Sequence, residues 1–100
     1  MSASEENKRD AADYGELIGR FVDRTIDAGQ FEQQYLDLMK NDEALHPDDV
    51  FAVLDGLFSE VDEYFVSPEA SPAERRDLDE ALRRHAVAAL ARLQQLGALG

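Results

Sequence analysis

The sequence predicts an all-α protein, folded as an antiparallel four-helix bundle. Apolar residues recur at helical spacing in four segments, and no segment alternates apolar and polar residues as a half-buried strand does. The connections between these segments are short, which favours antiparallel neighbours. Hydrophobic residues make up 44% of the 100-residue chain, enough for one modest core.

The chain is predicted to begin with a disordered tail, residues 1–10, followed by a single helical domain, residues 11–97. The tail has few apolar residues and no apolar segment typical of a secretory signal. We expect the first helix to run from about Ala11 to near Arg24. Its apolar positions are Tyr14, Leu17, Ile18, Phe21, Val22 and Thr25.

Asp27 predicts the start of the second helix, because it can cap the helix while Gln30 completes a capping box. Ile26 and Phe31 stand at the two positions of a hydrophobic staple around this cap. The helix is expected to end near residues 41–42. Its apolar face consists of Phe31, Tyr35, Leu38 and Met39.

Pro47 fits the first turn of the third helix, where Asp48 and Asp49 are favourably placed at the positive end. The apolar face of this helix consists of Val50, Val53, Leu54, Leu57, Phe58, Val61 and Tyr64. Gly56 lies on the opposite, exposed side, where it weakens the helix by about 1 kcal/mol relative to Ala.

The fourth helix has two candidate starts. Ser71 and Glu74 form a second capping-box pattern that begins the helix early, whereas Asp79 begins it after a short turn. Beyond both starts, apolar positions repeat at spacings of four and three: Leu82, Ala86, Ala89, Leu93 and Leu96. We expect Gly97 to end the helix and leave a frayed tail.

The charge distribution is the strongest clue to function. The net charge is −12, and the stretch from residue 42 to residue 74 carries −10 of it, since it has ten acids and no Lys or Arg. The ten are Asp42, Glu43, Asp48, Asp49, Asp55, Glu60, Asp62, Glu63, Glu69 and Glu74. This charge argues against nucleic acid or an anionic membrane as a direct ligand, because both bind positive surfaces. An alternative explanation of the acidic composition is that it serves only solubility or adaptation to high salt. Either would spread acids along the whole chain, whereas here they are concentrated in one stretch.

Residues that carry chemistry are few. There is no cysteine, which excludes disulfides and thiolate chemistry. We expect His46 to be a capping or exposed residue, and His85 to be packed or half-exposed beside the last apolar face. No metal, cofactor or catalytic motif occurs. Asp55-Gly56-Leu57 resembles the attachment site of acyl carrier proteins, but Gly56 stands in place of the attachment serine, so a carrier role is not supported. The sequence therefore predicts a soluble, cytoplasmic protein that is not an enzyme and has no cofactor.

Asp48, Asp55 and Asp62 are seven residues apart, so they drift by only about 20° per step around a helix. They form a row with steps of roughly 10.5 Å. The row lies beside the apolar face, with Ser59 and Glu63 further round the polar side. One interpretation is a solvated face that simply carries acids. The other is a row that docks on a basic surface of another protein, where complementary charge speeds association.

Four stretches, in a fixed order and spacing, resemble a known family. They are Ile18-x-x-Phe21; Ile26-Asp27-x-x-x-Phe31-x-x-x-Tyr35; Val50-Phe51-x-x-Leu54-Asp55-x-Leu57-Phe58-x-x-Val61-Asp62-x-Tyr64; and Leu78-Asp79-Glu80 followed by Leu82-Arg83. From about Leu17 to Leu93, the chain is similar to the colicin D immunity-like proteins, also described as bacterial self-protective colicin-like immunity proteins. The resemblance implies a small helical bundle that neutralises a ribonuclease toxin, typically a tRNase. It does so by filling the basic active-site cleft with acids where RNA phosphates would lie.

The resemblance also implies where the toxin binds. The predicted partner-binding residues are Asp55, Asp62, Glu63, Asp48 and Glu69. The first two follow from matched motif positions and the other three from the charge map. Tyr64 is either a contact or, as we favour, a core residue. The loop after it, residues 66–72, departs from the family pattern, so no loop contact is carried over.

The expected partner is a cognate basic nuclease toxin domain, bound one to one by a monomer, as in colicin or contact-dependent inhibition systems. No nucleic acid or membrane is expected to bind directly. The alternative is an acidic adaptor that masks a basic DNA-binding or sigma-type regulator. The identity of the partner discriminates between the two.

Overall fold

The computed structural model describes residues 11–42 and 46–99, and this part of the chain forms four helices. They are α1 (Ala12–Val22), α2 (Ala28–Asn41), α3 (Asp48–Glu63) and α4 (Pro72–Gln95). No strand occurs within these two ranges, so the predicted all-α four-helix bundle is confirmed. The predicted tail, residues 1–10, lies outside the described residues.

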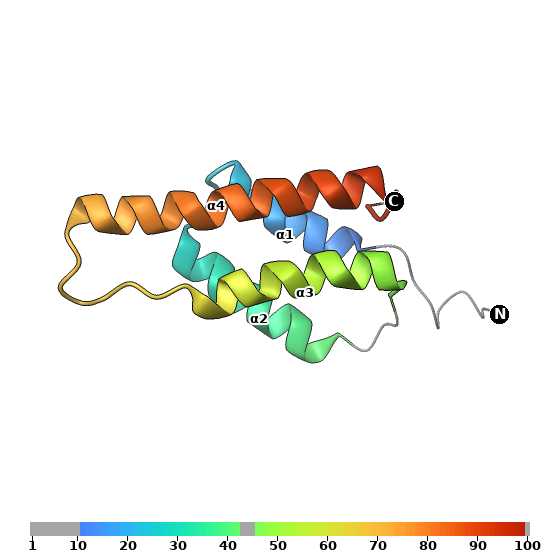
Figure 1. Cartoon of the computed structure of the whole chain (residues 1–100), viewed down its shortest axis with the longest axis horizontal. Coiled ribbons are helices and arrows are strands. Elements are labelled where there is room, and N and C mark those ends of the chain that lie inside the picture. Colours follow the sequence, from blue (N-terminus) through green and yellow to red (C-terminus); the bar gives the residue numbers. More distant parts are fainter. Residues whose placement is uncertain (1–10, 43–45, 100) are drawn as a thin grey trace.

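The four helices pack as a closed ring. α1 contacts α2 and α4, and α3 contacts the same two helices from the other side. α4 is the longest helix, and its first turns project beyond the end of α3 (Figure 1). Residues 64–71 run beneath this projection and connect α3 to α4 (Figure 1).

Apolar faces from all four helices meet in one core. The largest fully buried side chains include Tyr35, Phe21, Phe31 and Leu54. The rings of Phe21 and Phe31 stack with their centroids 4.4 Å apart. Tyr35 places its hydroxyl in the core, where it donates to the Leu54 carbonyl at 2.8 Å. This bond supplies the partner that a buried hydroxyl needs.

The predicted apolar face of α3 is confirmed. Four of its residues are buried, namely Val50, Leu54, Leu57 and Val61. The other three are partly buried against the core, namely Val53, Phe58 and Tyr64. Gly56 is exposed, as predicted.

Capping boxes begin α2 and α4. At α2 the Gln30 N–H donates to Asp27 Oδ1 at 2.7 Å, while the Asp27 N–H donates to Gln30 Oε1 at 3.0 Å. At α4 the Glu74 N–H donates to Ser71 Oγ at 3.1 Å, and the Ser71 N–H donates to Glu74 Oε1 at 2.9 Å. The earlier of the two candidate starts of α4 is therefore correct.

The end of α1 differs from the prediction by about two residues. Arg24 has a φ of 71°, which takes the chain out of the helix. The N–H groups of Arg24 and Thr25 turn back to the carbonyls of Phe21 and Arg20, at 3.1 and 2.8 Å. These two bonds satisfy carbonyls that the helix end would leave unpaired. Thr25 is consequently exposed and does not belong to the apolar face.

The expected frayed tail after Gly97 is wrong. Gly97 does end α4, with a φ of 69°, but Ala98 is fully buried and its carbonyl accepts the Ala11 N–H. Leu99 packs over Gly15 of α1, where an added Cβ would fall 2.5 Å from Leu99 Cδ2. The missing side chain at Gly15 makes room for the end of the chain.

The two histidines have different surroundings. His46 was predicted to be a capping or exposed residue, and it is neither: Pro47 is the N-cap of α3, and the His46 side chain is only 5% exposed, with its Nε2 3.0 Å from Asp42 Oδ2. The same Asp42 oxygen accepts the Tyr14 hydroxyl at 2.6 Å, which joins α1 to the end of α2. His85 is half-exposed, as predicted, and its Nε2 lies 3.3 Å from Glu60 Oε1.

Candidate partner-binding surface on α3

α3 presents different surfaces around its circumference. On one flank Glu60 pairs with His85, so this flank faces α4. Phe58 lies on the opposite flank and packs against the core, so that flank faces α2, the other neighbour of α3. Asp55 lies on the same side as Phe58, because residues three apart are neighbours on a helix surface. Its carboxylate accordingly adds to the effect of burial in raising the pKa of Tyr35 on α2.

Asp48, Asp55 and Asp62 form what we call the acidic strip. All three side chains are exposed, and their heptad spacing places them along the α2-facing edge of the exposed surface. The strip spans roughly 21 Å at 1.5 Å per residue. It therefore runs along nearly the whole 16-residue helix.

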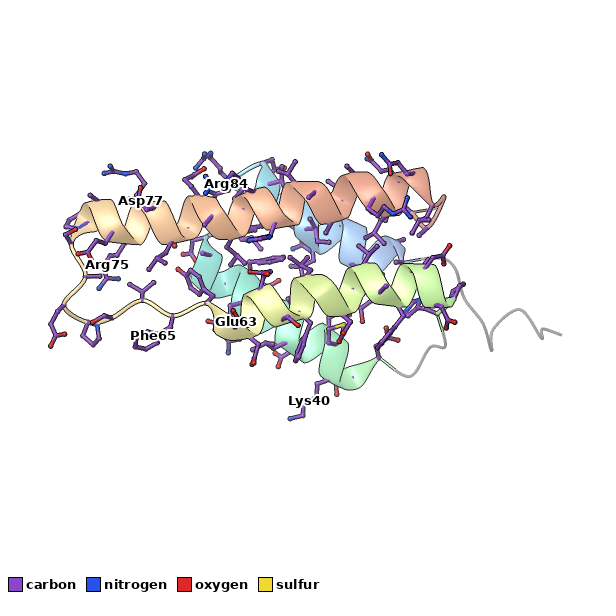
Figure 2. All side chains as sticks on the ribbon, in the orientation of Figure 1. Lys40, Glu63, Phe65, Arg75, Asp77 and Arg84 are labelled. Atoms are coloured by element: carbon purple, nitrogen blue, oxygen red, sulfur yellow. The ribbon has the colours of Figure 1, made fainter. Side chains whose placement is uncertain are left out.

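The charge of the acidic strip is not neutralised by the described part of the chain. No ion pair there involves a carboxylate of the strip. Some carboxylates elsewhere do have such pairs, as when Glu80 binds Arg24 at 3.0 Å and also binds Arg83. Lys40 of α2 extends away from the bundle (Figure 2). The strip therefore presents its charge to solvent.

The acids at the two ends of α3 have opposite effects on the stability of the helix. Asp48 lies in the first turn, where the helix dipole favours a negative charge. Asp62 and Glu63 lie in the last turn, which has no basic residue and where each carboxylate is unfavourable by about 0.3–1 kcal/mol. The last turn thus has charges that do not serve the stability of the helix.

Glu63 and Glu69 are exposed but do not join the acidic strip. Glu63, at the C-terminal end of α3 (Figure 2), lines a shallow groove of about 170 Å³ between α3 and α4. Glu69 lies in the segment between the two helices, where its N–H donates to Ser67 Oγ at 3.2 Å. The structure thus brings together three of the five predicted partner-binding residues and leaves two apart.

Tyr64 belongs to the packing of the bundle, as favoured from the sequence. Its ring is partly buried against the core, and its hydroxyl donates to Asp79 of α4. Burial and this hydrogen bond raise the pKa of Tyr64. This bond connects Tyr64, which directly follows α3, to the N-terminal part of α4.

Phe51 was not assigned to the core or to the site by the sequence. The structure leaves 51% of its surface exposed, on the strip side of α3. The sequence could have placed Phe51 beside the acidic strip, since Phe51 follows Asp48 by three residues and precedes Asp55 by four.

Within residues 11–42 and 46–99, no group of three or more His, Asp or Glu is arranged to hold a metal ion. None of the four helices in these ranges combines the length and the apolar character needed to cross a bilayer.

The fold and the acidic strip define a class of protein: a small acidic all-α bundle with one helix face whose charge has no ion pair within residues 11–42 and 46–99. Over residues 11–93 the chain matches the family described as bacterial self-protective colicin-like immunity. The match covers most of the chain, so the protein belongs to this family, and the resemblance seen in the sequence is confirmed. No curated protein and no solved structure gave a match. Membership makes the chain an immunity protein, one of a family of inhibitors that neutralise bacterial toxins.

Proposed function

We propose that this protein neutralises a ribonuclease toxin, of the tRNA-cleaving type, by occluding its basic active-site cleft. The observation that carries the proposal is the acidic strip, three exposed aspartates with no cation of their own among the described residues. A cleft that binds RNA needs positive charge to neutralise phosphates. The strip has the opposite sign and extends over roughly 21 Å of helix.

The mechanism needs no covalent step. The strip would lie along the cleft as a negatively charged edge, with steps of roughly 10.5 Å between carboxylates. This spacing resembles a string of phosphates without matching it residue for residue. The rest of the bundle then sterically blocks the entry of RNA into the cleft. We expect one monomer to bind one toxin domain in the cytoplasm, with electrostatic steering raising the association rate.

Growth rescue tests the proposal. A candidate ribonuclease toxin domain, chosen from the genes that neighbour the gene of this protein, is induced in a sensitive bacterium. The protein is co-expressed as wild type or as the double variant Asp55→Lys/Asp62→Lys. A second double variant, Asp37→Lys/Asp77→Lys, makes the same change in net charge at exposed aspartates of α2 and α4. Asp77 is a suitable control because it lies on the side of α4 away from α3 (Figure 2).

We expect rescue by the wild type and by the control, and failure of the strip variant although it is soluble. Rescue by all three would retain immunity and remove the acidic strip as the site. Failure of the wild type to rescue would reject a ribonuclease toxin as its partner. Co-purification with a non-toxic DNA-binding protein would then favour the acidic adaptor.

A further inference from the structure

α3 carries a second row beside the acidic strip. The sequence from residue 48 to residue 62 reads Asp48-x-x-Phe51-x-x-x-Asp55-x-x-Phe58-x-x-x-Asp62, a seven-residue repeat of one aspartate and one phenylalanine. Residues three or four apart are neighbours on a helix surface. Each phenylalanine therefore lies between two aspartates of the strip.

The two phenylalanines have different surroundings. Phe58 is partly buried and packs against the core, so it helps hold α3 in the bundle. Phe51 is 51% exposed, which leaves much of its ring open to a partner. The carboxylates on either side of it, Asp48 and Asp55, are exposed and have no ion pair among the described residues. The surface thus combines an aromatic ring with two unneutralised acids.

A partly buried arginine of the same molecule contacts an aromatic ring and a carboxylate together. The guanidinium carbon of Arg83 lies 4.6 Å from the centroid of the Phe21 ring. That guanidinium also pairs with the Glu80 carboxylate, and its Nε donates to the Phe21 carbonyl at 3.1 Å. One arginine is therefore held by an aromatic face and a carboxylate together, which is the geometry that suits its planar charged group.

We propose that Phe51, with Asp48 and Asp55, forms a docking site for an arginine side chain of a partner protein. The guanidinium would stack on the exposed ring and donate to the neighbouring carboxylates, much as Arg83 lies over the Phe21 ring and pairs with Glu80. Charge complementarity selects a basic partner, and the ring selects arginine over lysine, whose ammonium has no planar face to stack. The identification of this partner as the toxin rests on the proposed function.

Short peptides test the arginine site without the toxin. Hexa-arginine and hexa-lysine carry the same charge, and their binding to the full chain can be followed by NMR titration at low salt. The wild type should bind hexa-arginine more tightly than hexa-lysine, with the Phe51 ring signals shifting most. Phe51→Ala should remove this preference.

Phe65 supplies a matched control for the same change. It is 70% exposed, more than Phe51, but it follows the end of α3 and is not part of the strip. Phe65→Ala should retain the arginine preference of the wild type. The proposal is overturned if the wild type shows no preference, if Phe51→Ala retains it, or if Phe65→Ala removes it.

The toxin domain used in the rescue assay provides the second test. Phe51→Ala should raise Kd by about two- to thirty-fold, mainly through faster dissociation. Phe51→Trp keeps an aromatic face and should restore binding, which separates loss of the ring from loss of folding. Thermal unfolding of each variant checks the fold.

The outcomes separate the two proposals. If the wild type binds the toxin and Phe51→Ala binds equally well, the arginine site is wrong and the proposed function stands. If the wild type does not bind the toxin, but its arginine preference depends on Phe51, the proposed function is wrong and the arginine site stands.

Discussion

Two glycines show how backbone position decides the effect of a single residue. Gly56 lies within α3 on the exposed side, and nothing lies within 4 Å of the place where a Cβ would stand. Gly97 ends α4 with a φ of 69°, a conformation that side chains disfavour. The same substitution should therefore have opposite effects at the two positions.

We predict that Gly56→Ala raises the free energy of unfolding by about 1 kcal/mol, because alanine loses less backbone freedom in a helix. This corresponds to a rise in Tm of about 4–8 °C for a domain of this size. Gly97→Ala should lower the free energy of unfolding by about 1–2 kcal/mol. Thermal and urea unfolding followed by circular dichroism measure both values. A loss of stability in Gly56→Ala would contradict its exposed helical position.

Residue-level predictions from the sequence succeeded where the signal is local. The capping residues Asp27 and Ser71 act on N–H groups three residues away, so their pattern is visible in the sequence. The predictions of a capping or exposed His46 and of a frayed tail after Gly97 were wrong, because the packing of His46 and Leu99 depends on distant residues of α1. The Tyr14 ring that packs against His46, and the missing side chain of Gly15 beneath Leu99, leave no signal in the sequence next to His46 or Leu99.

At the level of elements, α3 combines favourable and unfavourable charges. Asp48 begins the helix and Asp62 lies in its last turn. We predict that Asp62→Lys raises the free energy of unfolding of the free protein by about 0.3–1 kcal/mol, and that Asp48→Lys lowers it by a similar amount. Urea unfolding at low salt measures the difference, which should shrink as salt is added.

Both substitutions should weaken toxin binding. A change that stabilises the free protein and weakens the complex is expected where function retains an unfavourable charge. A destabilised Asp62→Lys variant with unchanged affinity would contradict both the dipole argument and the site.

An ion-pair network joins the turn after α1 to α4. Glu80 binds Arg24 and Arg83, and Arg24 is the main cause of a Glu80 pKa below the ordinary value of 4.5. A lowered folded-state pKa contributes stability above pH 4.5, and this contribution is lost as the pH falls through the folded-state pKa. We predict that the stability of Glu80→Gln depends less on pH than that of the wild type in this acidic range. Equal acid sensitivity in the two proteins would show that the network does not couple to folding.

The elements themselves were largely predictable, since apolar spacing identified all four helices. The heptad spacing of Asp48, Asp55 and Asp62 likewise placed the acidic strip on one side of α3. Spacing could not place Glu69, because its position depends on the path of an irregular segment. Spacing within α3 also could not show whether a Lys or Arg of another helix pairs with the acidic strip, since this depends on how the helices pack.

At the scale of the whole molecule, all three tyrosines report on folding. Burial is the main cause of a raised pKa at Tyr14, Tyr35 and Tyr64. A raised pKa means that the neutral phenol is favoured in the folded state, so its contribution is present below the ordinary pKa of 10.0 and lost as the pH rises above it. We predict that phenolate absorbance appears only as helicity is lost at alkaline pH. Ultraviolet absorbance and circular dichroism, recorded on one sample, check this. Ionisation near pH 10.0 in a fully helical protein would contradict it.

The net charge of −12 also acts at this scale, because it attracts a basic partner from a distance while repelling other copies of the chain. Long-range attraction alone would make every acid equivalent. A contact on the acidic strip instead makes Asp48, Asp55 and Asp62 more important for binding than acids elsewhere.

Association kinetics of the toxin domain with this protein, measured over a range of salt concentrations, test that claim most directly. The wild type, Asp55→Lys/Asp62→Lys and Asp37→Lys/Asp77→Lys are compared. We predict fast, salt-sensitive association for the wild type, with a much larger loss of affinity in the strip variant than in the equally charged control. Equal losses in the two variants would contradict the claim, because they would show that net charge, and not the acidic strip on α3, determines binding.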